Sequence, residues 1–126
     1  MQAKPSTSWC PAIALLLLVA TPPAGTAQQL DGARLFQQRC AACHAIEPGQ
    51  NRIGPHLAGL AGRKAASVDG ARYSQALRDT QAVWDAQTLD RFLANPRQFA
   101  PGTTMNLAMP NAGERKALVD YLIALP

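Results

Sequence analysis

Three residues that can do chemistry lie within five positions: Cys40, Cys43 and His44. A C-x-x-C pair can form a redox disulfide or supply half of a zinc site, and C-x-x-C-H can attach a haem covalently. A thioredoxin-like site should follow a strand, and no strand is predicted before this motif. A zinc site usually takes four ligands from two spaced pairs, whereas the other histidine, His56, stands alone. Haem attachment accounts for all three residues, and the disulfide and the zinc site remain the alternatives.

An attached haem would hold Cys40 and Cys43 as thioethers and place His44 against one face of its iron. The second axial position has three candidates, Met105, Met109 and His56. A methionine in an apolar segment more often fills a gap in the core. Beside a haem-attachment motif, however, its sulfur becomes a candidate ligand. We therefore predict His44 and Met105 as the iron ligands of a single haem c.

The elements that must position these residues are predicted to be helices. Apolar residues at helical spacing predict a helix over residues 30–42, with Asp31 near its start. Asp85 should cap a second helix that ends at or before Asn95, and Asn111 and Glu114 resemble a capping box before a third. One or two helical turns are expected over residues 73–78. The fold class is therefore all-α, with three main helices plus short helical turns wrapped around the haem.

Two long connections are predicted to be irregular. Residues 48–62 are rich in glycine and proline and show no sustained period. Residues 95–110 contain several prolines and also apolar side chains, including that of Met105. Long loops inside compact domains are usually functional or disordered. Because a solvated linker has no need of apolar side chains, we expect the second connection to pack against another part of the molecule.

The N-terminal residues are typical of an export signal. Lys4 precedes an apolar run over residues 12–20 and then small residues up to Ala27. The run is too short for a membrane-spanning helix, which needs roughly 20 residues. We predict a signal peptide over residues 1–27, which would also remove Cys10, and a single mature domain over residues 28–126. This assigns the protein to the periplasm without a membrane anchor.

Composition argues against nucleic acid as a partner and indicates that the small domain needs a haem to fill its core. The formal net charge of the whole chain is +4, and the basic residues are scattered, so nucleic-acid binding is not expected. Aromatic residues make up only 6% of the chain. A small domain buries a limited share of its surface. A buried macrocycle would supply the apolar filling that the side chains do not.

The mature chain resembles the class I cytochromes c over essentially its whole length. Gly32 and Phe36 are similar to the glycine and aromatic pair of the family's first helix. The motif at residues 40–44 matches the haem attachment site, and the stretch over residues 54–63 is similar to the family's glycine-proline loop. Asn95-Pro96, followed by residues 101–105, resembles the segment that ends in the axial methionine.

This resemblance implies further site residues. Pro55 stands where the family's proline carbonyl accepts a hydrogen bond from the proximal histidine, a contact that tunes the ligand. Four residues fall where the family places polar contacts to a haem propionate: Arg63, Tyr73, Ser74 and Trp84. Phe92 and Leu77 depart from the pattern, since many members have a tyrosine and an asparagine there. The resemblance therefore implies a drier haem crevice in this chain.

The predicted function is single-electron transfer by a monomeric periplasmic haem protein that is not an enzyme. Its partners would be an electron donor, such as a dehydrogenase or a membrane cytochrome complex, and an acceptor, such as a terminal oxidase or reductase. Two alternatives remain. One is a haem enzyme or gas sensor with a labile methionine, and the other is an electron-transfer subunit bound permanently to a dehydrogenase or oxidase.

Overall fold

The computed structural model describes residues 1–3 and 30–126. The predicted signal peptide, residues 1–27, falls almost entirely outside the described residues, as does Cys10. Its cleavage site and the N-terminal limit of the mature domain therefore stay predictions. Within the described ranges, no helix combines the length and apolar character needed to cross a membrane.

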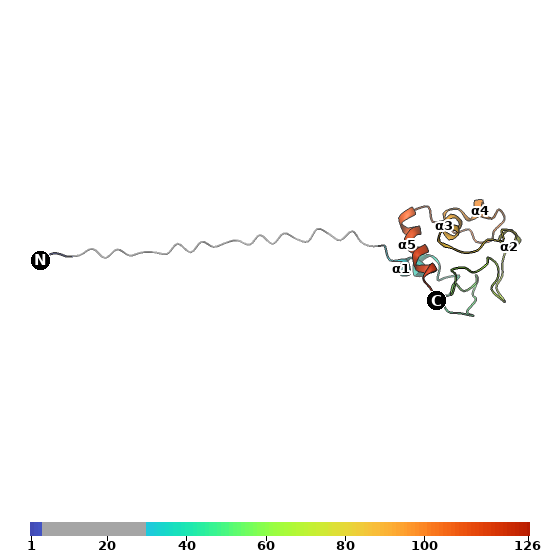
Figure 1. The fold of residues 1–126 in the computed structure, drawn as a ribbon, viewed down its shortest axis with the longest axis horizontal. Coiled ribbons are helices and arrows are strands. Elements are labelled where there is room, and N and C mark those ends of the chain that lie inside the picture. Colours follow the sequence, from blue (N-terminus) through green and yellow to red (C-terminus); the bar gives the residue numbers. More distant parts are fainter. Residues whose placement is uncertain (4–29) are drawn as a thin grey trace.

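The folded domain is built from helices joined by long turns, which confirms the predicted all-α class (Figure 1). Its extended pairing, among the described residues, is one isolated bridge between Lys64 and Val83. The helices are α1 (Gly32–Arg39), α2 (Gln75–Asp79), α3 (Ala86–Ala94), α4 (Pro96–Phe99) and α5 (Ala112–Ile123).

Helix α1 is shorter than the predicted range 30–42 at both ends. Asp31 caps it by accepting a hydrogen bond from the Ala33 N–H at 3.0 Å, so Leu30 lies outside the helix and is exposed. At the other end, the amides of Cys40 and Ala41 both donate to the Phe36 carbonyl. Sharing one carbonyl ends the regular helix. The cysteine motif therefore lies in the turn that follows α1.

The crossing of α1 and α5 holds the two ends of the domain together (Figure 1). A Cβ at Gly32 would overlap the Ala117 carbonyl and the Tyr121 side chain, so the helix backbones approach at a distance that only glycine allows. The Phe36 and Tyr121 rings pack beside this contact with centroids 6.2 Å apart. This crossing fixes the position of the turn that carries the cysteines.

Helix α3 begins and ends where the sequence predicts. Asp85 accepts from the Thr88 N–H at 2.7 Å, and the helix ends at Ala94, two residues before Pro96. The connection over residues 95–110 is less irregular than expected, because α4 opens it. Pro96 occupies the first turn of α4, and Asn95 caps it by accepting from the Gln98 N–H.

Helix α5 confirms the Asn111 cap, whose Oδ1 accepts from the Glu114 N–H at 3.0 Å. Its buried residues Leu118, Val119 and Leu122 join the core with the apolar faces of α1 and α3. Trp84, Phe92 and Phe99 form an aromatic cluster, with Trp84 and Phe92 centroids 5.3 Å apart. These elements enclose a central cavity, and that cavity is the candidate site.

Candidate functional site

A cavity of about 380 Å³ lies in the middle of the domain, a volume within the usual range for ligand pockets. Residues from α1, α2, α3 and α5 and from the connections between the helices line it. Most of the lining side chains are apolar, and they include Leu57, Leu60, Leu89, Phe92 and Leu93. An interior of this kind excludes water and gives a low local dielectric constant. All nine residues predicted from the sequence as site residues line this one cavity: Cys40, Cys43, His44, Pro55, Arg63, Tyr73, Ser74, Trp84 and Met105.

The His44 ring is held by one short hydrogen bond. Its Nδ1 lies 2.7 Å from the Pro55 carbonyl oxygen. A carbonyl can only accept, so Nδ1 carries the proton and Nε2 keeps a free lone pair. Burial lowers the pKa of His44 below its ordinary 6.5, and this outweighs the opposite effect of the hydrogen bond to Pro55. The ring is therefore a neutral imidazole ready to bind a metal through Nε2.

Gly54 lets the chain pass close to this ring. A Cβ at Gly54 would overlap His44 Cε1 and would lie 2.8 Å from Nδ1. The Gly54 amide also donates to the Cys43 carbonyl at 2.8 Å, and the Leu57 amide donates to the Ala45 carbonyl at 2.8 Å. These bonds join the turn of the cysteine motif to the glycine-proline loop, so the ring is positioned from both directions.

Both thiols are free cysteines in the structure. Cys40 is buried, and this burial raises the pKa of its thiol to about 11, with Arg39 acting in the opposite direction. A thiol with so high a pKa is neutral at pH 7 and is a poor redox nucleophile. No group of three or more His, Cys, Asp or Glu side chains in the described part of the chain could hold a metal ion. The raised pKa of Cys40 disfavours a dithiol redox site, and the described residues offer no cluster of ligands for a zinc ion.

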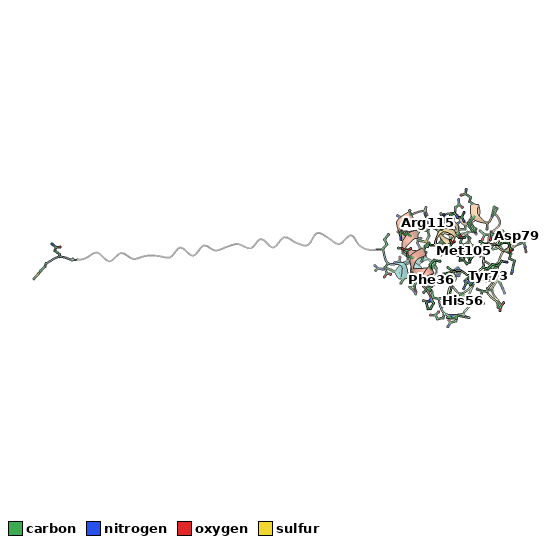
Figure 2. All side chains as sticks on the ribbon, in the orientation of Figure 1. Phe36, His56, Tyr73, Asp79, Met105 and Arg115 are labelled. Carbon is green, nitrogen blue, oxygen red and sulfur yellow. The ribbon has the colours of Figure 1, made fainter. Side chains whose placement is uncertain are left out.

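The structure separates the two methionines of the connection between α4 and α5. Met105 is half-buried and lines the cavity, and it lies near the middle of the domain in Figure 2. Met109 is 1% exposed and belongs to the hydrophobic core, away from the cavity lining. Of the two methionines, only Met105 therefore lines the cavity.

His56, the third candidate, does not line the cavity. Its backbone N–H donates to Asn51 Oδ1 at 3.1 Å, and its carbonyl accepts from Arg63 at 3.0 Å. Its Nδ1 is buried and has no hydrogen-bond partner in the structure. These contacts give His56 a place in the glycine-proline loop rather than in the cavity.

The polar residues of the cavity are also bonded to the surrounding backbone. Arg63 donates to the carbonyls of Ala58 at 2.7 Å and His56 at 3.0 Å, and burial lowers the pKa of its guanidinium. The Tyr73 hydroxyl accepts from the Val68 N–H at 3.2 Å, which leaves its own proton free to donate. Ser74 caps α2 by accepting from the Leu77 N–H. They thus hold the turns around the cavity and face it at the same time.

Two cavity-lining arginines were missed by the sequence interpretation, Arg39 and Arg72. Each is the immediate neighbour of a predicted site residue, Cys40 and Tyr73 respectively, and this adjacency is the signal that could have found them. With Arg63, they make three guanidinium groups around a cavity whose lining contains no carboxylate side chain. Such a site favours a ligand that carries negative charge.

The residues present fit a covalently attached haem. Two thiols, a neutral imidazole nitrogen and a thioether face a mostly apolar cavity, and arginines line it where carboxylate groups of a ligand could be neutralised. The orientation of His44 by a backbone carbonyl is the usual support for a metal-binding histidine.

Comparisons with known proteins agree with this chemistry. The family model Cytochrome c matches residues 29–126. The cytochrome c-type cyt cy of Rhodobacter capsulatus is 40% identical over 96 residues, which are 75% of this chain and 48% of that protein, so the chain spans about half of that relative. Cytochrome c2 iso-2 of Magnetospirillum molischianum is 40% identical over 87 residues, 68% of this chain and 90% of that one. The solved structure of cytochrome cH from Methylobacterium extorquens superposes with a TM-score of 0.66 at 34% identity, covering 72% of this chain and 92% of that chain.

Proposed function

Because this chain belongs to the cytochrome c family, whose members are haem-based electron carriers, we propose that it is a periplasmic carrier with His44 and Met105 as axial ligands. The covalently bound haem c of the family would be attached through Cys40 and Cys43, which fit the family's C-x-x-C-H motif. When bound, the haem supplies a centre that gains and loses one electron. The observation that carries the proposal is that one cavity is lined both by Met105 and by His44, whose Nε2 is left free by the bond to Pro55.

The chain's own residues would set the redox behaviour of this centre. The hydrogen bond from His44 to Pro55 fixes the imidazole and strengthens it as a donor. A methionine sulfur favours the reduced iron and so raises the potential relative to a second nitrogen ligand. The apolar lining also disfavours the additional positive charge of the oxidised centre. Two side-chain ligands leave no coordination position for a substrate, which supports a carrier rather than an enzyme.

The propionate groups are proposed to lie against Arg63, Tyr73, Ser74 and Trp84. Arg63 is the strongest of these candidates, because its guanidinium is half-buried beside the cavity and meets only neutral backbone carbonyls in the structure. A buried cation without an anionic partner is costly. A carboxylate from the cofactor would provide that partner. Arg72, which also lines the cavity, is a further candidate for such contacts.

Redox partner proteins are proposed to bind where the cavity opens to the surface. Ile53 is 78% exposed and lines the cavity together with the exposed Arg72 and with Arg39. An apolar side chain surrounded by cations suits a partner with an apolar centre and acidic surroundings. The periplasmic location is supported by the signal-like sequence of residues 1–27 and by the use of both cysteines in an attachment motif.

Spectroscopy of the purified holoprotein tests the ligand assignment. The native ferric protein should show the weak far-red absorption band of a sulfur-to-iron bond, and Met105→Ala should abolish that band while the haem stays attached. Met109→Leu is the matched control, because it removes the other sulfur of the same connection and should keep the band. A native protein without the band, or a band that survives in Met105→Ala, would contradict His/Met ligation.

Carbon monoxide separates the carrier from the gas-sensor alternative. A carrier with both axial positions occupied should not bind carbon monoxide in the reduced native state, whereas Met105→Ala should bind it. Rapid binding by the native protein would favour an enzyme or a sensor with a labile methionine. Co-purification with a dehydrogenase or oxidase at high salt would instead favour a permanent subunit.

A further inference from the structure

Arg115 is the most heavily bonded arginine side chain in the described part of the molecule that does not line the cavity. It lies on α5 (Figure 2), and only 14% of its side chain is exposed. Its Nε donates to Asp90 Oδ1 of α3 at 2.7 Å. Its Nη1 donates to the Met109 carbonyl at 2.8 Å and to the Pro110 carbonyl at 3.3 Å. One guanidinium thus joins α5, α3 and the connection between α4 and α5.

The two carbonyls lie where the methionine segment, residues 104–108, rejoins the core. Met109 is anchored there in two further ways, since its side chain is 1% exposed and its amide donates to the Leu93 carbonyl at 2.8 Å. Pro110, in contrast, is exposed and has no amide hydrogen to donate. Arg115 therefore provides the side-chain hydrogen bonds that fasten this exit of the segment to α5, beside the packing of Met109 in the core.

The methionine segment itself has few bonds. Among the described residues, its hydrogen bonds are one from the Met105 amide to Thr103 Oγ1 at 3.4 Å and one from Arg97 to Asn106 Oδ1 at 3.2 Å. The first is long, and the second is exposed. The entrance of the segment is held by the Thr103 amide, which donates to the Ala100 carbonyl at 2.8 Å. The hydrogen bonds that hold residues 104–108 therefore lie mainly at the two ends of the segment, while Met105 between them packs against the core.

From this arrangement we propose that Arg115 is a positioning residue for the Met105 sulfur. This inference rests on the proposed function, because it assumes that Met105 is an axial ligand. Fixing both ends of a short segment limits the conformations in which its ligand is displaced, and so raises the local concentration of the thioether at the cavity. Loss of the guanidinium frees the Met109 and Pro110 carbonyls and leaves Asp90 unpaired. The segment then leaves the cavity more often, and external ligands compete better with the sulfur.

Imidazole binding to the ferric holoprotein tests this role. The imidazole affinity is not set by the stability of the fold alone. Arg115→Leu should raise the imidazole affinity about tenfold, the scale of one lost charge-assisted hydrogen bond, and should weaken the far-red band. Arg115→Lys should restore part of the effect, because an ammonium keeps the charge but cannot match the fork of a guanidinium. Each titration is done well below the melting temperature of the variant.

Two variants on the same helix serve as controls. Lys116→Gln removes an equal charge from an exposed side chain that pairs with Asp120. Val119→Ala removes buried apolar atoms and destabilises the fold, but it alters none of the three acceptors of Arg115. Both should keep the native imidazole affinity and the native band.

The outcomes are distinct. A native protein that shows the band, with imidazole affinity raised in Arg115→Leu and unchanged in both controls, supports the positioning role. An affinity in Arg115→Leu that equals that of Val119→Ala would overturn this role while leaving His/Met ligation intact. A native protein that lacks the band would overturn the ligand assignment and the positioning role with it.

Discussion

The two regions that face the cavity hold their proposed ligands in different ways. His44 is fixed locally, because it follows two attachment cysteines and donates to Pro55 at 2.7 Å. The Met105 sulfur makes no hydrogen bond to the described part of the chain; its side chain packs against the core, and its segment is hydrogen-bonded mainly at its ends. The comparison indicates that the histidine side resists local disturbance, whereas the methionine side depends on distant anchors. Ligand exchange should therefore begin at Met105.

The largest effect is expected from removing the covalent attachment. Cys40→Ser combined with Cys43→Ser should leave the chain largely unfolded, because the interior then surrounds a cavity of about 380 Å³ in a small domain. Far-ultraviolet circular dichroism should show little helix. Cys43→Ser alone, which keeps one thioether, should retain helical structure. A native helical signal in the double variant would mean that both sides of the cavity are ordered without haem.

Truncation of the buried methionine should loosen the methionine side. Met109→Ala removes a fully buried anchor and should lower the free energy of unfolding by about 2–5 kcal/mol. It should also weaken the far-red band, because the exit of the Met105 segment loses its packing. Urea unfolding and absorbance of the ferric protein measure the two effects. Met109→Leu conserves the side-chain volume and should lower the free energy of unfolding by less than about 1.5 kcal/mol. An unchanged band in Met109→Ala would contradict the view that the methionine side of the cavity depends on distant anchors.

The equivalent test of the histidine side is Gly54→Ala. The added Cβ would lie 2.8 Å from His44 Nδ1, so the ring or the loop must move, at a cost of about 1–3 kcal/mol. Weakening the bond to Pro55 makes the imidazole a poorer donor, and the reduction potential should rise. Redox titration and thermal unfolding measure both changes. Gly113→Ala, in the first turn of α5, is the control. Its added Cβ would lie 3.4 Å from the nearest atoms, so the reduction potential should stay unchanged.

A smaller effect is expected from acid titration of the α3 cap. The Thr88 backbone N–H lowers the pKa of Asp85 below its ordinary 3.8, so the capping bond stabilises the fold above that value. The stabilisation is lost as the pH falls through the lower pKa of the folded state. Asp85→Asn keeps a capping oxygen that does not titrate. The difference in melting temperature between the two proteins should be constant above about pH 5 and should change below pH 3.8; a constant difference throughout would contradict this role of the carboxylate.

Local signals made much of the helical pattern predictable. Asp85 and Pro96 mark the limits of α3, and Asn111 marks the start of α5, because a cap or a proline acts within a few residues of its own position. The end of α1 was not predictable in this way. The Phe36 carbonyl takes two donors there, and the crossing at Gly32 with α5 sets the direction of the chain.

The attachment chemistry can be read from a local motif, since Cys40, Cys43 and His44 lie within five positions and need no distant residue to be recognised. Packing in three dimensions sets which methionine lines the cavity, which nitrogen of His44 keeps its lone pair, and where Arg115 binds. Each of these depends on contacts between separate elements of the fold, such as that of Arg115 on α5 with Asp90 on α3. Such contacts follow from how the helices pack, and spacing along the sequence does not encode them in any local pattern.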